Sequence, residues 1–439
     1  MNHAKNLTVA GIAVAVAASL AACAEFAETM YPPIKWESKA LPEAQGRVET
    51  KDGKPQHVRY KEGPFSGVTA DFSKYRTQAY GDMRPELAVQ KVAMPTNLKG
   101  DAKEGRKIYM SRAIGPCTGC HLIRGDDVWP AGNIGPDHQK IGDAGYKDEE
   151  LYQMVYDIRA VYPESIMPPW GAAGVLTPQQ IVHVVEFLKT QKGDLPPVKD
   201  PQRDPNTRAK PTGFGDNLDP TNNPAILEIE SAEKNWAKKG PKGKACADCH
   251  QGGVEKAMKG VATRYPRFVK EYGRMMAMEE FLQMHGPATT GIEMPSQSKL
   301  NLNMSMLVKF QSNGMPLNLD LASLESQAAL KRGEATYNKR VGQRNHACAD
   351  CHNEAPGKGG NKFLGGRLLA TVDSGMMNHF PLWRTNFTKV WDPRKRFQWC
   401  MTPLGMNYLA SDSVEYAELE FYLASFGQGK PLTAPGIRH

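Results

Sequence analysis

Apolar side chains recur at helical spacing in three separate segments of the chain. The apolar positions are Val182, Val185 and Leu188 in the first, Leu302, Met306 and Phe310 in the second, and Leu419, Tyr422 and Leu423 in the third. The string Thr177-Pro178-Gln179-Gln180 forms a capping box with proline at the first helical position. Asp412-x-x-Glu415 opens the third segment, and Gly427 ends it. The pattern predicts a mainly α-helical protein with much loop.

Stretches without such periodicity divide the chain. Residues 23–97 are rich in Pro, Gly and charge, which predicts an extended spacer. Residues 193–224 are rich in proline, which favours a stiff linker. We therefore expect one domain at 98–192 and, beyond the linker, two modules at 225–328 and 329–439.

The N-terminus has the features of an export signal over residues 1–22. Lys5 supplies a positive charge, and an apolar segment too short to span a membrane follows it. Small residues then precede Cys23, as in a bacterial lipobox, so we expect Cys23 to carry lipid. The alternative is an ordinary signal peptide that leaves Cys23 as a free thiol. Both interpretations predict a periplasmic protein, and the first predicts a lipid anchor.

Three Cys-x-x-Cys-His motifs account for six of the eight cysteines. They are Cys117-Thr-Gly-Cys120-His121, Cys246-Ala-Asp-Cys249-His250 and Cys348-Ala-Asp-Cys351-His352. This spacing is the attachment signature of c-type haem. Two thiols on one helical turn reach the haem vinyl groups, and the next residue offers its imidazole to the iron. The sequence predicts three covalently bound haems c.

The surroundings of the motifs favour haem over other uses of paired cysteines. Gly105-x-x-x-Tyr109 and Gly333-x-x-x-Tyr337 precede the first and third motifs, which indicates a helix leading into each site. A tetrahedral zinc site or a redox dithiol would also use Cys-x-x-Cys pairs. Neither accounts for the histidine that follows all three pairs. We therefore expect three cytochrome c-like haem modules.

The sixth iron ligand decides what each haem can do. Met167, held in a loop by two prolines, is the candidate for the first haem and would raise its potential. Cys400 lies outside the motifs and is the candidate for the third haem, where Arg396 would favour its thiolate. The residues leave several candidates for the second haem, which are His285, Met275, Met276, Met278, Met284 and Met294.

Composition excludes two function classes. The chain has 439 residues with 55 Lys+Arg and 47 Asp+Glu, and this mild positive charge forms no basic block. It therefore predicts no nucleic-acid partner. After the N-terminus no apolar run is long enough for a membrane-spanning helix.

Longer strings resemble the SoxAX cytochromes of bacterial sulfur oxidation. Residues 98–192 resemble the SoxX subunit through the first haem motif, Gly132-Asn-Ile-Gly135-Pro136 and Met167-Pro-Pro. Residues 225–439 resemble the dihaem SoxA subunit. The strings that carry this second likeness are Gln311-Ser-Asn-Gly-Met315-Pro316, Phe380-Pro-x-x-Arg384, Arg396-x-x-x-Cys400 and Ser411-Asp412-x-x-Glu415-Tyr416. The chain is similar to a natural fusion of SoxX and SoxA.

The resemblance implies an L-cysteine S-thiosulfotransferase. Such an enzyme joins thiosulfate oxidatively to a cysteine of the carrier protein SoxYZ and passes two electrons through haems to a small cytochrome c. It implies that Cys400 is the active cysteine and that Arg396 holds the anionic sulfur substrate. The family uses a second cysteine as the first haem ligand in SoxA. Here His285 stands in that stretch, so we expect His250 and His285 to bind the second haem.

A further departure from the family keeps other functions open. The family carries a further arginine after the active cysteine, whereas Met401-Thr-Pro-Leu-Gly405-Met406 is uncharged, so another sulfur donor remains conceivable. One alternative is a thiosulfate dehydrogenase that forms tetrathionate. The other is an electron-transfer cytochrome in which Cys400 is only a ligand. A dihaem peroxidase is disfavoured because every haem has a candidate sixth ligand.

Overall fold

The computed structural model describes residues 48–51, 54–57, 88–111, 114–115, 117–128, 130–195, 197, 200–208, 223–340, 346–353, 362–372, 375–401, 409 and 411–438. The predicted signal segment, Cys23 and most of the predicted spacer lie outside these residues. So do residues 209–222 of the predicted linker and residues 402–408 after Cys400. Only a two-stranded hairpin, β1 (Val48–Lys51) with β2 (Lys54–His57), is described before residue 88.

The described part of the N-terminal domain contains three α-helices. They are α2 (Ala102–Met110), α3 (Asp148–Asp157) and α4 (Pro178–Lys189). Helix α4 begins at the predicted capping box, where the Thr177 side chain accepts from the Gln180 amide. A Cβ atom on Gly105 would lie 1.9 Å from the His183 carbonyl oxygen, so glycine lets α2 cross α4 closely. These helices enclose one apolar core.

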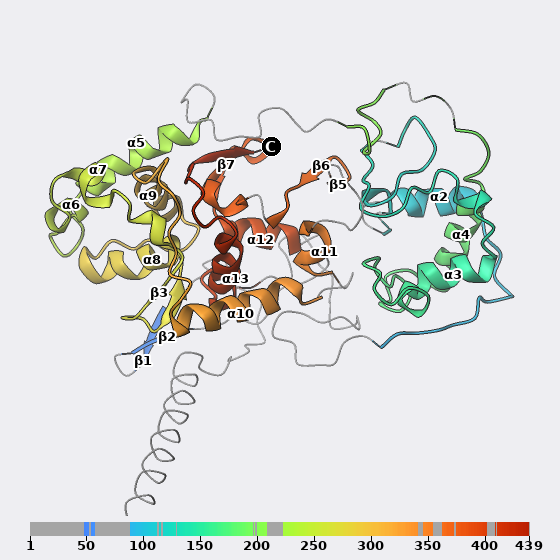
Figure 1. Cartoon of the computed structure of the whole chain (residues 1–439), viewed down its shortest axis with the longest axis horizontal. Helices are drawn as coiled ribbons and strands as arrows, with labels where there is room; N and C mark the ends of the chain where they lie inside the picture. The colour runs from blue at the N-terminus through green and yellow to red at the C-terminus, as the bar shows by residue number, and fades with distance from the viewer. Residues whose placement is uncertain are drawn as a thin grey trace, which may run out of the picture.

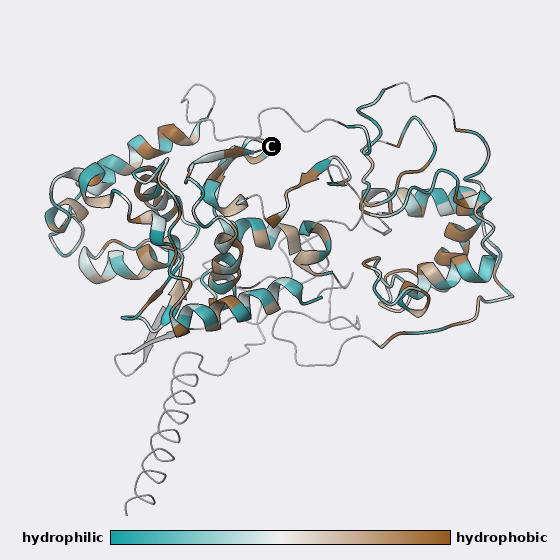
Figure 2. Ribbon diagram, in the orientation of Figure 1, coloured by the Kyte–Doolittle hydropathy of each residue, from teal (hydrophilic) through white to brown (hydrophobic). Residues whose placement is uncertain are grey.

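The C-terminal unit has more helices and several short strands (Figure 1). Its helices are α5 (Ala225–Trp236), α6 (Cys246–Cys249), α7 (Gly253–Met258), α8 (Met278–Thr289), α9 (Lys299–Phe310), α10 (Leu324–Asn338), α11 (Cys348–His352), α12 (Pro393–Met401) and α13 (Val414–Ser425). Figure 2 shows hydrophilic and hydrophobic stretches along α5 and α10, as amphipathic helices require. No helix within the described residues is both long and apolar enough to cross a membrane.

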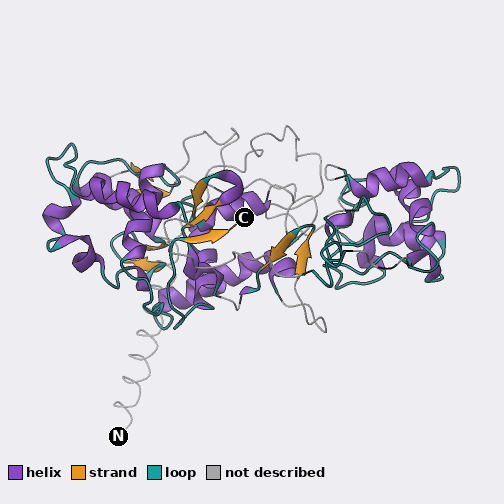
Figure 3. Cartoon of the chain, turned by 90° about the horizontal axis from the view of Figure 1, so that it is seen from above, coloured by secondary structure: helices purple, strands orange, loops and turns teal. Residues whose placement is uncertain are grey.

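Short strands lie between the helices (Figure 3). They are β3 (Arg267–Val269), β4 (Arg274–Met276), β5 (Lys362–Leu364), β6 (Arg367–Leu369), β7 (Leu382–Arg384), β8 (Lys389–Trp391) and β9 (Gly436–Arg438). Strands β3–β4 and β5–β6 form antiparallel hairpins. Strand β7 pairs antiparallel with β8, Leu382 facing Trp391, and parallel with β9, Leu382 facing Gly436.

One apolar core runs through both predicted C-terminal modules. It extends from Ala225 on α5 to Leu432 near the C-terminus. Helix α10 crosses α13 as α2 crosses α4, since a Cβ atom on Gly333 would lie 2.3 Å from the Glu418 carbonyl oxygen. The predicted Gly-x-x-x-Tyr repeat is therefore a repeated helix crossing.

The third predicted helix begins one residue later than expected. The side chain of Ser413, not that of Asp412, accepts the Tyr416 amide. The carboxylate of Asp412 turns inward and accepts a hydrogen bond of 3.1 Å from Gln283 on α8. The Asp412 side chain thus hydrogen-bonds to the buried Gln283 side chain instead of capping the helix.

Candidate functional site

The first Cys-x-x-Cys-His motif forms a tight turn with an oriented histidine. Cys117 begins a short 3₁₀ helix, and its carbonyl accepts from the amides of Cys120 and His121 at 3.0 and 2.8 Å. The His121 Nδ1 atom lies 2.8 Å from the Pro136 carbonyl oxygen. With its proton on Nδ1, this imidazole donates to Pro136 and leaves Nε2 for a metal. The geometry suits an iron ligand.

Gly135 is required beside this histidine. A Cβ atom there would lie 2.3 Å from the His121 ring. Met167 lies in the loop after α3, where its amide donates to the Ser165 hydroxyl, and it lines the same cavity as His121. The structure therefore places both predicted ligands of the first haem around one space.

The histidine of the second motif lies close to His285. Helix α6 begins at Cys246 and ends at Cys249, and His250 follows directly. The ring centroids of His250 and His285 lie 6.2 Å apart. An iron with metal–nitrogen bonds of about 2 Å would separate two axial imidazole centroids by about 6 Å. The two residues thus fit a haem held between them, and Phe281 stacks on His285 with centroids 5.0 Å apart.

The third motif lies against Cys400. His352 ends α11, and its Nδ1 atom is 2.7 Å from the Ala370 carbonyl oxygen, the same arrangement as at His121. Cys400 lies on α12, and its sulfur interacts directly with His352. Burial raises the pKa of the Cys400 thiol, but the charge of Arg396, the His352 contact and the charge of Arg367 outweigh it and lower the pKa to about 7. The thiolate that an iron ligand requires is therefore favoured.

One cavity of about 1350 Å³ joins the first and third motifs. Cys117, Cys120 and Met167 line one part of it, and Cys351 and Cys400 line another. In Figure 1 the second motif on α6 lies at the opposite end of the molecule from α2, with α11 between them. The structure thus brings the first and third motifs together and leaves the second motif on the far side of the third.

A hairpin and the linker hold the two parts of this cavity together. The Asn133 amide donates to the Phe363 carbonyl at 3.1 Å, and the Phe363 amide donates to the Asn133 side chain at 2.8 Å. The Gly365 amide donates to the Gly119 carbonyl at 2.8 Å. Arg208 of the linker donates to the Gly365 carbonyl at 3.1 Å and covers the Phe363 ring. Hairpin β5–β6 is therefore docked on the N-terminal domain.

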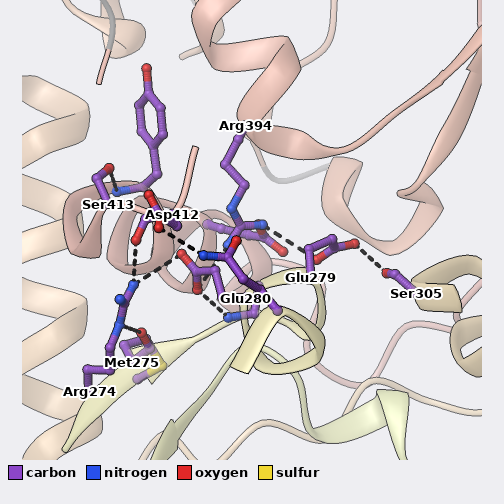
Figure 4. Close-up of polar contacts among 12 residues, drawn as sticks. Arg274, Met275, Glu279, Glu280, Ser305, Arg394, Asp412 and Ser413 are labelled. Atoms are coloured by element: carbon purple, nitrogen blue, oxygen red, sulfur yellow. Dashed lines mark hydrogen bonds and ion pairs between the residues drawn. The ribbon is translucent and has the colours of Figure 1, made fainter. Parts of the chain in front are cut away.

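A buried set of charges joins the second haem site to the helix that carries Cys400 (Figure 4). We call it the Arg394 cluster, and its members are Arg274, Glu279, Glu280, Lys309, Arg394 and Glu420. Arg394 of α12 pairs with Glu279 and Glu280 of α8 at 3.6 and 3.5 Å and also with Glu420 of α13. Since His285 also lies on α8, the cluster connects the helix that carries His285 with the helix that carries Cys400.

Sequence patterns missed two features of the site. Arg367 and Arg384 join Arg396 near Cys400. The charge of Arg367 lowers the pKa of the Cys400 thiol, and Cys400 in turn raises the pKa of Arg384. Arg384 belongs to the Phe380-Pro-x-x-Arg384 string, so a signal existed, whereas Arg367 has none. His138 stacks on His121 with centroids 3.9 Å apart, which no periodicity indicates.

Two regions match families of cytochrome c. Residues 100–188 match the family described as cytochrome C oxidase, cbb3-type, subunit III. Residues 231–317 match the family described as SoxA/TsdA, cytochrome c domain. Each of these two regions is therefore a cytochrome c domain, which implies covalently bound haem c. The cysteine pairs and oriented histidines described above fit that cofactor.

Over about half of its length the chain is homologous to SoxA. It is 27% identical to L-cysteine S-thiosulfotransferase subunit SoxA of Rhodovulum sulfidophilum over 51% of this chain and 75% of that protein. It is 28% identical to the SoxA subunit of Paracoccus pantotrophus over 50% of this chain and 73% of that protein. The crystal structure of SoxXA from P. pantotrophus superimposes with a TM-score of 0.44 and 26% identity, covering 50% of this chain and 80% of that one.

Proposed function

We propose that this chain is a three-haem cytochrome that joins thiosulfate oxidatively to a cysteine of a SoxYZ-type carrier protein. The observation that carries the proposal is the position of Cys400. Its sulfur contacts His352, and the charge of Arg396 favours its thiolate form. Cys400 lines a cavity that extends to the first haem motif. Similarity to SoxA over about half of the chain supports it.

The reaction forms one S–S bond. The carrier thiol and the outer sulfur of thiosulfate become bonded, and the thiol proton and two electrons are released. Bound haem supplies the one-electron acceptor, and a small cytochrome c removes the electrons one at a time. Arg396 holds the anion, because a guanidinium stays charged and presents paired donors to sulfonate oxygens.

The chain's own residues hold the haems in this proposal. His121 and Met167 bind the first, which is attached at Cys117 and Cys120. His250 and His285 bind the second, which is attached at Cys246 and Cys249, as the 6.2 Å centroid separation supports. His352 and Cys400 bind the third, which is attached at Cys348 and Cys351. Ligation by both histidines would leave the second haem the chemistry of electron transfer.

The proposed location is the periplasm. The export signal at residues 1–22 supports it, and lipid on Cys23 would hold the protein at a membrane surface. Palmitate labelling of the wild-type chain and of Cys23→Ser tests the anchor. Label on the wild type alone supports lipidation, and label on neither contradicts it.

Intact-mass analysis of the carrier tests the proposed reaction. The holoprotein is incubated with thiosulfate, a SoxYZ-type carrier and oxidised cytochrome c, beside Cys400→Ala and the control Lys395→Ala. Lys395 is exposed on the same helix. We expect a thiosulfonate adduct on the carrier with the wild type and with Lys395→Ala only. An undiminished adduct with Cys400→Ala would overturn the role of this cysteine.

Thiosulfate dehydrogenase is the second candidate, because residues 231–317 match a family shared by SoxA and TsdA. It would couple two thiosulfates to tetrathionate with release of two electrons. Tetrathionate formed without any carrier, together with an unmodified carrier, would select this activity instead.

A further inference from the structure

Two guanidinium groups meet on one indole beside Cys400. The Arg367 guanidinium carbon lies 4.0 Å from the Trp399 ring centroid, and that of Arg396 lies 4.7 Å from it. Trp399 directly precedes Cys400, and Arg396 lies one helical turn before it. All four side chains line the cavity that joins the first and third haem motifs. Cation–π contacts thus hold two positive charges at the active cysteine.

Arg384 adds a third guanidinium group to this part of the structure, and its charge interacts with Cys400. Within the described residues, Arg396 Nη1 and Arg384 Nε are buried and have no hydrogen-bond partner. Burial lowers the pKa of Arg384 to about 10, and the charges of Arg396 and Arg367 add to this effect. Gathering like charges costs free energy that a bound anion recovers. The arrangement therefore suits a small oxyanion.

The first of these guanidinium groups depends on the N-terminal domain for its position. Arg367 begins β6, and the hairpin that carries it is docked through Asn133, Phe363 and Arg208. Both arginines belong to the C-terminal unit, but the hairpin that carries Arg367 is held by contacts with Asn133 of the N-terminal domain and Arg208 of the linker. The cavity is complete only where the two parts meet.

We propose that Arg367 and Arg396, spaced by Trp399, form a two-guanidinium clamp for the sulfonate end of a sulfur oxyanion whose other end reaches Cys400. Arg367 is then a substrate-binding residue delivered by a hairpin docked on the N-terminal domain. This inference rests on the proposed function, since it names the substrate group that the same site holds.

Equilibrium binding of thiosulfate to the oxidised holoprotein tests the clamp without a carrier. Calorimetry gives the affinity, and the electron paramagnetic resonance spectrum shows whether the anion perturbs a haem. We expect Arg367→Gln to weaken binding by about tenfold or more, since charge-assisted hydrogen bonds are lost. Arg367→Lys should keep part of the affinity. The control Lys395→Gln also removes one positive charge, from an exposed position on α12. Its affinity for thiosulfate should stay within about twofold of the wild-type affinity.

A second pair of variants separates the clamp from a general structural effect. Asn133→Ala leaves both guanidiniums intact but loosens the hairpin, so we expect weaker thiosulfate binding with unchanged visible spectra of the haems. If Arg367→Gln itself disturbs the spectra, Arg367→Lys decides, because it keeps the charge and the stem. Wild-type affinity in both Arg367 variants would overturn the clamp.

The two proposals fail in different ways. Carrier adduct formed at unchanged KM by Arg367→Gln would refute the clamp and leave the thiosulfotransferase activity standing. Thiosulfate binding that depends on Arg367, without any carrier adduct in the wild type, would refute the activity and leave the anion clamp standing. A raised KM with unchanged kcat in Arg367→Gln is the result expected if both hold.

Discussion

The imidazole rings of His250 and His285 face each other with centroids 6.2 Å apart and planes inclined by 51°. We predict that His285→Ala converts one low-spin haem to a high-spin state, because its iron loses a strong axial ligand. Electron paramagnetic resonance of the oxidised protein measures the change. His379→Ala is the control, since His379 lies 2.6 Å from the Thr433 hydroxyl and away from His250. An unchanged low-spin spectrum in His285→Ala would exclude His285 as the ligand.

A methyl group at position 135 should disturb the first haem. In Gly135→Ala the new Cβ would lie within 2.8 Å of three atoms of the His121 ring, so the imidazole must move. Overpacking of this kind costs about 1–3 kcal/mol. We expect a lower melting temperature and a changed potential of the first haem, measured by thermal unfolding and redox titration. Gly119→Ala is the control, because its Cβ would meet only Leu364 at an ordinary 3.5 Å. Equal behaviour of the two variants would contradict this account.

Local patterns predicted several of the helices, and they remain the basis for the predicted haem attachment residues. The capping box at Thr177 and the Gly-x-x-x-Tyr strings specify structure through neighbours in sequence, and the structure has both features. The Cys-x-x-Cys-His motif likewise needs only one turn of chain. The pairing of His285 with His250 needed the family resemblance, because five methionines were equally plausible by periodicity.

Contacts across long sequence separations were beyond such patterns. Arg367 reaches Trp399 only because a hairpin docks on Asn133, which lies more than two hundred residues earlier. The inward turn of Asp412 depends on Gln283 in the same way. Such positions follow from packing between elements, and a single sequence does not encode them in any local period.

The ion pairs of the Arg394 cluster should be the main interactions that fix α12 against α8 and α13. Arg394→Met leaves Glu279, Glu280 and Glu420 buried without their shared cation, which costs about 3–5 kcal/mol in comparable buried pairs. We expect a lower denaturation midpoint and a changed spectrum of the haem near Cys400. Lys395→Met, one residue along the helix and exposed, should change neither. A wild-type midpoint for Arg394→Met would show that the cluster does not fix α12.

Glu420 should make stability depend on pH, because its carboxyl group shares Arg394 with Glu279 and Glu280. Burial raises the pKa of Glu420 from 4.5 to about 7, although Arg394 and Lys309 oppose this. Between these values the unfolded chain releases its proton while the folded chain keeps it, so the contribution of Glu420 to stability falls as pH rises. Gln has no such titration. The stability of Glu420→Gln relative to wild type should therefore increase from pH 4.5 to 7, by at most about 3 kcal/mol.

Chemical denaturation of both proteins at a series of pH values measures this difference. The exposed Glu230→Gln on α5 serves as control and should give a flat difference across the same range. The Glu420→Gln difference must rise with pH for the account to hold, because a carboxylate stabilised by Arg394 would produce the opposite slope and would lose its contribution as pH falls. A rising difference would mean that Glu279, whose pKa is lowered to about 2, is the ionised partner of Arg394. Glu420 would then stay protonated in the folded chain near neutral pH.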